Sequence, residues 1–164
     1  MIPPPVWARR RRAKKKDFFN RPSVGQTGGG IVYLTKKVEF SASHRYYQPK
    51  LSVARNKRLF GKCFWPHGHG HNYTLEVTIR GPVDPVTGMV MNIKELKRIL
   101  HQVVEKFDHR FLNLDLPEFK EIVPTTENIA RVIWRMIQKR YPKISLSRIC
   151  LWEGNGLYVE YFGA

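Results

Sequence analysis

The chain has 164 residues, of which 42% are hydrophobic and 26% charged, proportions typical of one modest globular domain. No segment approaches the roughly 20 consecutive apolar residues of a transmembrane helix, and two cysteines are too few for a disulfide scaffold. With 29 basic and 13 acidic residues, the formal net charge is +16. This excess indicates either an anionic ligand or partner, or only a strongly solvated surface.

Residues 1–30 are predicted to form a disordered basic extension, followed by one globular domain over residues 31–164. The extension carries a run of three prolines, eight basic residues against one acid, and three glycines at its end. It lacks the apolar stretch of a secretory signal, so we expect a cytoplasmic protein. Its charge would permit weak contact with nucleic acid, and an idle tail is the alternative.

Within the domain, four segments have the pattern of β-strands. Residues 31–43 are rich in β-branched and aromatic side chains, and residues 69–80 alternate between apolar and polar positions. The polar, basic segment 44–62 between them is predicted to be a long loop. Residues 147–153 and 157–162 are predicted to form a closing hairpin around a Gly-Asn-Gly turn.

Two helices are predicted from apolar stripes that begin at capping residues. Asn92 has the character of an N-cap, with Glu95 as its capping-box partner. Thr125 or Thr126 would cap the second helix, which ends before Pro142. Because strands and helices do not alternate as βαβ units, the pattern favours an α+β fold with an antiparallel sheet.

The histidines are the main candidates for chemistry. In an extended chain, the rings of His67, His69 and His71 would share one face, since side chains two residues apart point the same way. Imidazoles suit zinc, and three protein nitrogens with an open fourth position form a catalytic site. His44, at the end of the first predicted strand, is an equally good third ligand. The alternative is a polar, glycine-rich loop with adventitious metal affinity.

Cys63 lies six residues before His69 and is predicted to be either a metal ligand or a reacting group. Cys150, inside an apolar strand, is better explained as a buried, inert cysteine. Asp108 and His109 form an acid–imidazole pair after the first helix. Because adjacent side chains rarely bond to each other, we expect each of the two to serve a different neighbour. Asp108 is as well explained as a helix-end residue.

Six motifs together resemble the 6-pyruvoyltetrahydropterin synthase family, which includes the 6-carboxytetrahydropterin synthases. They occur in order over residues 32–163 and are Phe40–His44, Leu59–Cys63, His69–Tyr73, Asp84–Asn92, Phe107–His109 and Thr125–Asn128. The resemblance implies a T-fold, an antiparallel β-sheet with two helices packed on one face. It further implies that trimers close into a β-barrel and pair into a homohexamer.

The resemblance also implies the roles of the site residues. Zinc (Zn2+) would be held by His44, His69 and His71, which leaves His67 as a neighbour and not a ligand. Cys63 would be the base that abstracts a proton, with Asp108 and His109 contributed by a neighbouring subunit. The residues implied to line the pterin pocket are Thr125, Thr126, Glu127 and Glu153, with Glu153 gripping the guanidine-like edge of the ring.

The implied activity is that of a zinc-dependent lyase of tetrahydrobiopterin biosynthesis. It would convert 7,8-dihydroneopterin triphosphate to 6-pyruvoyltetrahydropterin and release triphosphate. The alternative on the same substrate is 6-carboxytetrahydropterin formation in queuosine biosynthesis, and a remote one is a non-catalytic polyanion-binding protein. The chain departs from the animal enzymes at Phe64, Trp65 and His67, where bulky side chains would reshape the pocket.

Overall fold

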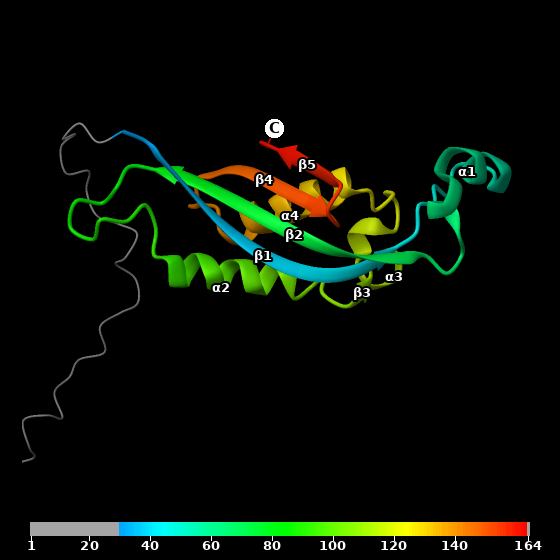
Figure 1. Ribbon diagram of the computed structural model, residues 1–164, viewed down its shortest axis with the longest axis horizontal. Helices are drawn as coiled ribbons and strands as arrows, with labels where there is room; N and C mark the ends of the chain where they lie inside the picture. Colours follow the sequence, from blue (N-terminus) through cyan, green and yellow to red (C-terminus); the bar gives the residue numbers. More distant parts are fainter. Residues whose placement is uncertain (1–29, 164) are drawn as a thin grey trace, which may run out of the picture.

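The computed structural model describes residues 30–163, which form a five-stranded sheet in the order β3-β1-β2-β4-β5 with the longer helices packed against it (Figure 1). The prediction for residues 1–29 lies outside this described part. The strands are β1 Val32–His44, β2 His69–Gly81, β3 Arg110–Phe111, β4 Leu146–Glu153 and β5 Leu157–Tyr161. The helical elements are α1 Val53–Phe60, η2 Gly61–Phe64, α2 Ile93–Val104, α3 Leu112–Asp115, η3 Pro117–Phe119 and α4 Thr126–Arg140.

The sheet is built on one long antiparallel pair, β1 with β2. Each strand has 13 residues, and the register runs from Val32 opposite Gly81 to His44 opposite His69. Both strands were predicted, to within one or two residues at their ends. Since directly opposed side chains lie on the same face of a sheet, this register places His44 and His69 side by side.

The prediction of a purely antiparallel sheet is wrong at one edge. β3 pairs with β1 in parallel, through Ala42 opposite Arg110 and Ser43 opposite Phe111, so the sheet is mixed. β3 has only two residues and follows directly from a turn in which the His109 N–H donates to the Ser41 carbonyl at 2.6 Å. A strand this short has no periodicity from which it could be predicted.

The two predicted helices, α2 and α4, begin at the predicted caps. The Asn92 side chain accepts from the Lys94 N–H at 2.9 Å, and the Thr125 side chain accepts from the Asn128 N–H at 3.4 Å. Glu95 pairs with Arg98 on the exposed surface of α2.

Both helices pack their apolar faces against one face of the sheet (Figure 1). Leu75 and Val77 of β2, Leu100 of α2 and Ile133 of α4 are fully buried there. Burying a side chain of this size stabilises the fold by about 1.5–3 kcal/mol. On the same face, His44, His69, His71 and Glu153 lie towards the end of the sheet at which β1 stops and β2 begins.

The segment predicted as a long loop, residues 44–62, contains the short helix α1. Its sequence has no apolar stripe, because the helix projects from the end of the sheet and buries only Asn56 (Figure 1). The Asn56 side chain accepts from the Gln48 N–H at 2.8 Å and donates to the carbonyls of Gln48, Leu51 and Ser52. A buried polar side chain therefore holds this segment in place, which a search for apolar periodicity does not detect.

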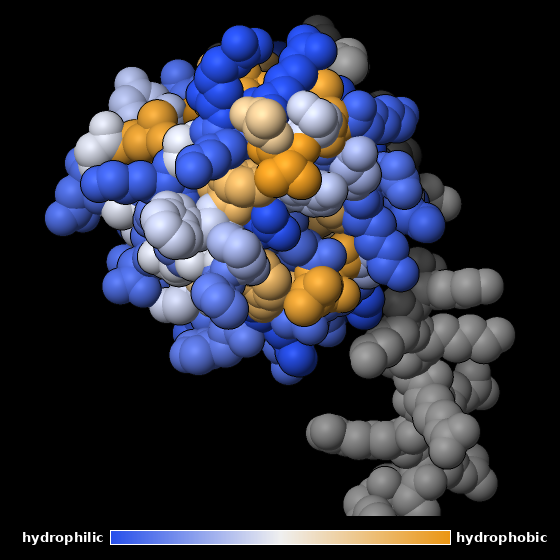
Figure 2. Space-filling model, turned by 90° about the vertical axis from the view of Figure 1, so that its right-hand side faces the viewer, coloured by the Kyte–Doolittle hydropathy of each residue, from blue (hydrophilic) through white to orange (hydrophobic). Residues whose placement is uncertain are grey.

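The end of the molecule that carries α1 has a mainly hydrophilic surface, with separate hydrophobic patches (Figure 2). Val53, Leu59 and Trp65 are among its exposed apolar residues. No helix within residues 30–163 has both the length and the apolar character needed to cross a membrane.

Candidate metal centre

Three imidazoles converge where β1 ends and β2 begins. His44 is the last residue of β1, His69 is the first residue of β2 directly opposite, and His71 follows on the same face. One nitrogen from each of the three rings lies within 4.8 Å of the others. Nε2 of His44 is 3.2 Å from Nε2 of His69. The shared face of His69 and His71 was predicted from strand parity.

The donor set of three imidazole nitrogens fits a divalent transition-metal ion such as zinc. Tetrahedral zinc with Zn–N bonds of 2.0–2.1 Å places two imidazole nitrogens about 3.4 Å apart, close to the separation of the His44 and His69 nitrogens. Nε2 of His71 is buried and makes no hydrogen bond with any described residue, although Oε1 of Glu153 lies 3.3 Å away. A buried polar atom without a partner is costly, and a metal ion would satisfy it.

Burial favours the neutral form of two of these rings, His44 and His69. Burial lowers the pKa of His44 to about 4, against the opposing charge of Glu153. Burial, with His71 as the next cause, also lowers the pKa of His69. Because metals bind neutral imidazole, these side chains are in the ligating form around neutral pH.

A hydrogen-bonded network behind the histidines orients the His44 ring. Tyr73, on the same face of β2, donates its hydroxyl proton to Oε2 of Glu153 at 3.4 Å, and the same oxygen accepts from the Thr126 hydroxyl. The Tyr73 oxygen lies 3.2 Å from Nδ1 of His44. With its single proton given to Glu153, Tyr73 accepts from Nδ1–H of His44. This tautomer leaves the lone pair of His44 Nε2 free for a metal.

His67, one member of the contiguous triplet, is not part of the cluster. It is exposed and lies before β2, because the chain turns at Gly68 with φ +67°. A Cβ on Gly68 would lie 2.6 Å from the His44 carbonyl oxygen and 2.7 Å from the Phe111 ring. The close approach of this turn to His44 therefore requires glycine, and it separates His67 from the other rings. The ligand set implied by the resemblance is the one that converges.

Cys63 lies in η2, the short helical turn that connects α1 to the histidine-bearing strand. Its carbonyl accepts from the Tyr46 N–H at 2.8 Å, and its side chain is partly buried. Burial and the negative charge of Glu153 raise the pKa of the thiol. The negative charge of Glu153 also acts to raise the pKa of His44, so the same carboxylate influences both the cysteine and this histidine. Within residues 30–163, the converging ligand set holds no cysteine.

Asp108 and His109 bond to each other, contrary to the expectation for adjacent residues. Nδ1 of His109 lies 3.0 Å from Oδ2 of Asp108, and this contact is made with His109 at φ +57°. Oδ1 of Asp108 accepts from the Ser41 N–H at 2.9 Å, which is the main cause of its lowered pKa. The His109 side chain is 82% exposed. An open hollow of about 490 Å³ has both His71 and His109 in its lining.

The other predicted pocket residues are at the start of α4 and the end of β4. Thr126 is buried and bonded to Glu153, whereas Thr125 is occupied as the helix N-cap. Glu127 is exposed in the first turn of α4. The structure thus brings Thr126 and Glu153 to the histidines. Tyr73 was missed as a site residue because its position in an alternating strand indicates core packing, although it shares the parity of His69 and His71.

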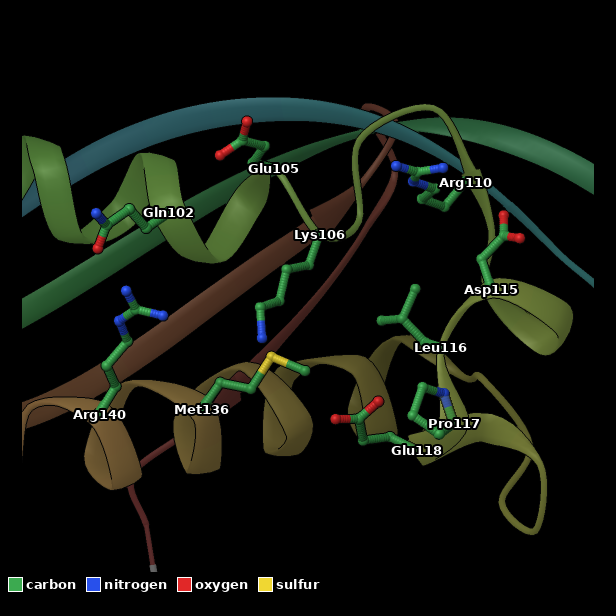
Figure 3. A pocket seen from close by; sticks show the side chains of 10 residues that line it. All are labelled: Gln102, Glu105, Lys106, Arg110, Asp115, Leu116, Pro117, Glu118, Met136 and Arg140. Atoms are coloured by element: carbon green, nitrogen blue, oxygen red, sulfur yellow. The ribbon is translucent and has the colours of Figure 1, made fainter.

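A second hollow, of about 830 Å³, lies apart from the histidines at the ends of α2 and α4 (Figure 3). Lys106 extends from the end of α2 towards Met136 of α4, and Glu105, Glu118 and Arg140 add charges of both signs. None of the clustered histidines lines it.

The fold and the cluster define an α+β protein in which three converging histidines could hold a metal ion. A family model described as 6-pyruvoyl tetrahydropterin synthase matches residues 33–164. The human 6-pyruvoyl tetrahydrobiopterin synthase is 44% identical over 140 residues, which cover 83% of this chain and 97% of that protein. The chain belongs to the 6-pyruvoyl tetrahydropterin synthase family, a family of enzymes.

Two further similarities indicate the fold and the breadth of the family. The solved structure of the Caenorhabditis elegans 6-pyruvoyl tetrahydropterin synthase has a TM-score of 0.80 and 38% identity, covering 83% of this chain and 98% of that chain. A dihydroneopterin monophosphate aldolase from Pyrococcus furiosus is 41% identical over 97 residues, which cover 58% of this chain and 79% of that protein. Similar chains therefore include enzymes with different names and reactions.

Proposed function

We propose that the protein is a zinc-dependent 6-pyruvoyltetrahydropterin synthase that acts on 7,8-dihydroneopterin triphosphate. The observation that carries the proposal is the convergence of His44, His69 and His71 beside the carboxylate of Glu153. The reaction eliminates triphosphate and rearranges the remaining side chain, so that it consumes no external oxidant or reductant. The similarity to synthases of this name over most of the chain supports the choice.

In this proposal the metal ligands are His44, His69 and His71, and Cys63 is the base that takes a proton from the substrate side chain. Zinc, when bound, would polarise the substrate hydroxyls and supply positive charge that lowers the pKa of a nearby thiol. That contribution matters because burial and Glu153 raise the pKa of Cys63 in the chain alone.

Glu153 and Thr126 are proposed to bind the pterin, together with Thr125 and Glu127 at the start of α4. A carboxylate can accept two hydrogen bonds from a guanidine-like edge, which suits the amino-pyrimidine part of a pterin. The Glu153 side chain is fixed in position, because it is only 11% exposed and accepts a hydrogen bond from the Thr126 hydroxyl.

Asp108 and His109 are proposed to complete a neighbouring subunit's site in a homohexamer. The exposure of the His109 ring supports this role, because no group within residues 30–163 other than Asp108 pairs with it. Mixing a Cys63→Ser variant with a His109→Ala variant, each inactive alone, is then expected to restore activity after subunit exchange. Light scattering that gives a monomeric mass would contradict the proposal.

We further propose that the protein is cytoplasmic, because both its cysteines are unpaired, as is usual in a reducing compartment.

The decisive experiment is incubation of the zinc-loaded protein with 7,8-dihydroneopterin triphosphate. Triphosphate release is followed by ion-exchange chromatography and the product by mass spectrometry. Release of triphosphate with 6-pyruvoyltetrahydropterin supports the proposal, whereas no release from the zinc-loaded protein rejects it. Acetaldehyde with 6-carboxytetrahydropterin would instead assign the queuosine pathway. Carbon–carbon cleavage of the monophosphate substrate would assign an aldolase, the activity named for the Pyrococcus protein.

A further inference from the structure

Arg45, the residue after the last residue of β1, has its backbone fixed by a distant side chain. Its N–H donates to Oδ1 of Asn113 at 2.7 Å, and Nδ2 of Asn113 donates to the Arg45 carbonyl at 2.9 Å. Asn113 lies in α3, 68 residues further along the chain. The side-chain amide of Asn113 thus satisfies both the backbone N–H and the backbone carbonyl of Arg45, as a neighbouring β-strand would do.

The Arg45 side chain is held just as closely, and its contacts lead to Cys63. Nε of Arg45 donates to the Phe64 carbonyl at 2.8 Å, and the guanidinium carbon lies 4.7 Å from the centre of the Phe64 ring. It also lies 4.6 Å from the centre of the Tyr47 ring. Since the Tyr46 N–H donates to the Cys63 carbonyl at 2.8 Å, residues 45–47 hold η2 at the cysteine and at the residue after it.

The charge of Arg45 has no acidic partner that would explain its position. No carboxylate within residues 30–163 forms an ion pair with it, and the sequence contains no acid between Glu39 and Glu76. Two aromatic faces and a carbonyl surround it instead. A planar guanidinium can stack on rings while its Nε–H donates in the plane, which a lysine ammonium cannot do. The Arg45 side chain therefore fixes the position of the Phe64 backbone and does not neutralise an acidic group among the described residues.

We propose that Arg45 and Asn113 are positioning residues, which fix the sulfur of Cys63 relative to the three histidines. The inference rests on the proposed role of Cys63 as the base. Arg45 acts through the backbone of Phe64, next to Cys63, and Asn113 acts through the backbone of Arg45. Asn113 follows Asp108 and His109 closely in the chain, so its bonds to Arg45 tie that pair's segment to the cysteine's segment.

The test uses Arg45→Met in the full-length, zinc-loaded protein. Because small displacements of a catalytic group can cost about 100-fold in rate, kcat is expected to fall by about 10- to 100-fold, with little change in KM. Zinc content should stay at the wild-type level. Alkylation of Cys63 by iodoacetamide, read by peptide mass spectrometry, should become faster as the partly buried thiol is released. Arg45→Lys should not restore kcat, because lysine keeps the positive charge but lacks the planar guanidinium that stacks on Tyr47 and Phe64 and donates from Nε.

Two more variants make the result interpretable. Arg55→Met removes an exposed cation from α1 and should leave kcat and alkylation unchanged. Asn113→Ala should act in the same direction as Arg45→Met, and it replaces that variant should Arg45→Met fail to fold. Wild-type kcat and alkylation rates in the Arg45 or Asn113 variant, or loss of zinc together with kcat, would overturn the inference. A wild-type protein without turnover would reject the proposed function, whereas the alkylation rates would still decide the positioning role.

Discussion

Replacing Gly68 by alanine tests whether the turn before β2 is built against His44. Gly68 has φ +67°, a conformation that costs an L-residue about 1–2 kcal/mol. The added Cβ would also lie 2.6 Å from the His44 carbonyl oxygen and 2.7 Å from the Phe111 ring. The carbonyl belongs to the end of β1 and cannot rotate away, so the turn must shift. Overpacking of this kind typically costs a further 1–3 kcal/mol, roughly.

Gly88→Ala provides a matched control. Gly88 has φ +68°, and a Cβ placed on it would meet nothing within 4 Å. Both variants therefore share the cost of the left-handed backbone and the smaller gain from a stiffer unfolded chain. Only the Gly68 variant adds the collision with His44 and Phe111, and the difference between the two isolates that collision.

The assay is thermal unfolding followed by circular dichroism, at equal concentrations of protein and zinc. For a chain of this size, 1 kcal/mol shifts the melting temperature by about 2–4 °C. Gly68→Ala is therefore expected to melt about 2–12 °C below Gly88→Ala. It should also bind zinc more weakly, because the turn that must shift leads directly into His69, a proposed ligand. Equal melting temperatures would refute the argument that this turn packs against His44.

Three further substitutions test the rest of the site. Cys63→Ser should lower kcat by at least about 100-fold, the usual contribution of a general base, and should retain zinc. Loss of zinc in this variant would show that Cys63 is a metal ligand. Glu153→Gln should raise KM about tenfold or more, because it removes a charged acceptor for the pterin, and an unchanged KM in steady-state kinetics would exclude that role. Asp108→Asn should lower the melting temperature at pH 7 by a small amount, since the carboxylate is 41% exposed. The hydrogen bond from the Ser41 N–H lowers the pKa of Asp108 in the folded protein. The ionised carboxylate therefore stabilises the fold fully above its unfolded-state pKa of about 3.9, and this stabilisation is lost as the pH falls through the lower folded-state pKa. The deficit should therefore shrink below about pH 4, and a constant deficit would contradict this cause.

Most of the fold follows from local patterns in the sequence. β1, β2, α2, α4 and the final hairpin are long or well capped, and each has its own periodicity. The polar helix α1 could not be predicted in this way, because the buried Asn56 and not an apolar stripe anchors it. The parallel pairing of β3 depends on where the turn at His109 meets Ser41, a contact between segments far apart in the chain.

The site was partly predictable for the same reason. Strand parity places His69 and His71 on one face, but parity alone could not choose between His44 and His67 as the third ring. That choice depends on the register of β1 against β2, which sets His44 opposite His69, and on the turn at Gly68. The bond between Asp108 and His109 was unexpected because adjacent side chains rarely bond to each other, and it forms with His109 at a positive φ, which is uncommon for a residue other than glycine.

The most direct test of the account is the metal content of the purified protein and its single histidine variants. The account predicts one zinc per chain in the wild type, as for a three-histidine site. His44→Ala, His69→Ala and His71→Ala should each lose the zinc, whereas His67→Ala should keep it, because His67 is exposed outside the cluster. Zinc retained in all four variants, or lost only with His67, would contradict the three-histidine centre.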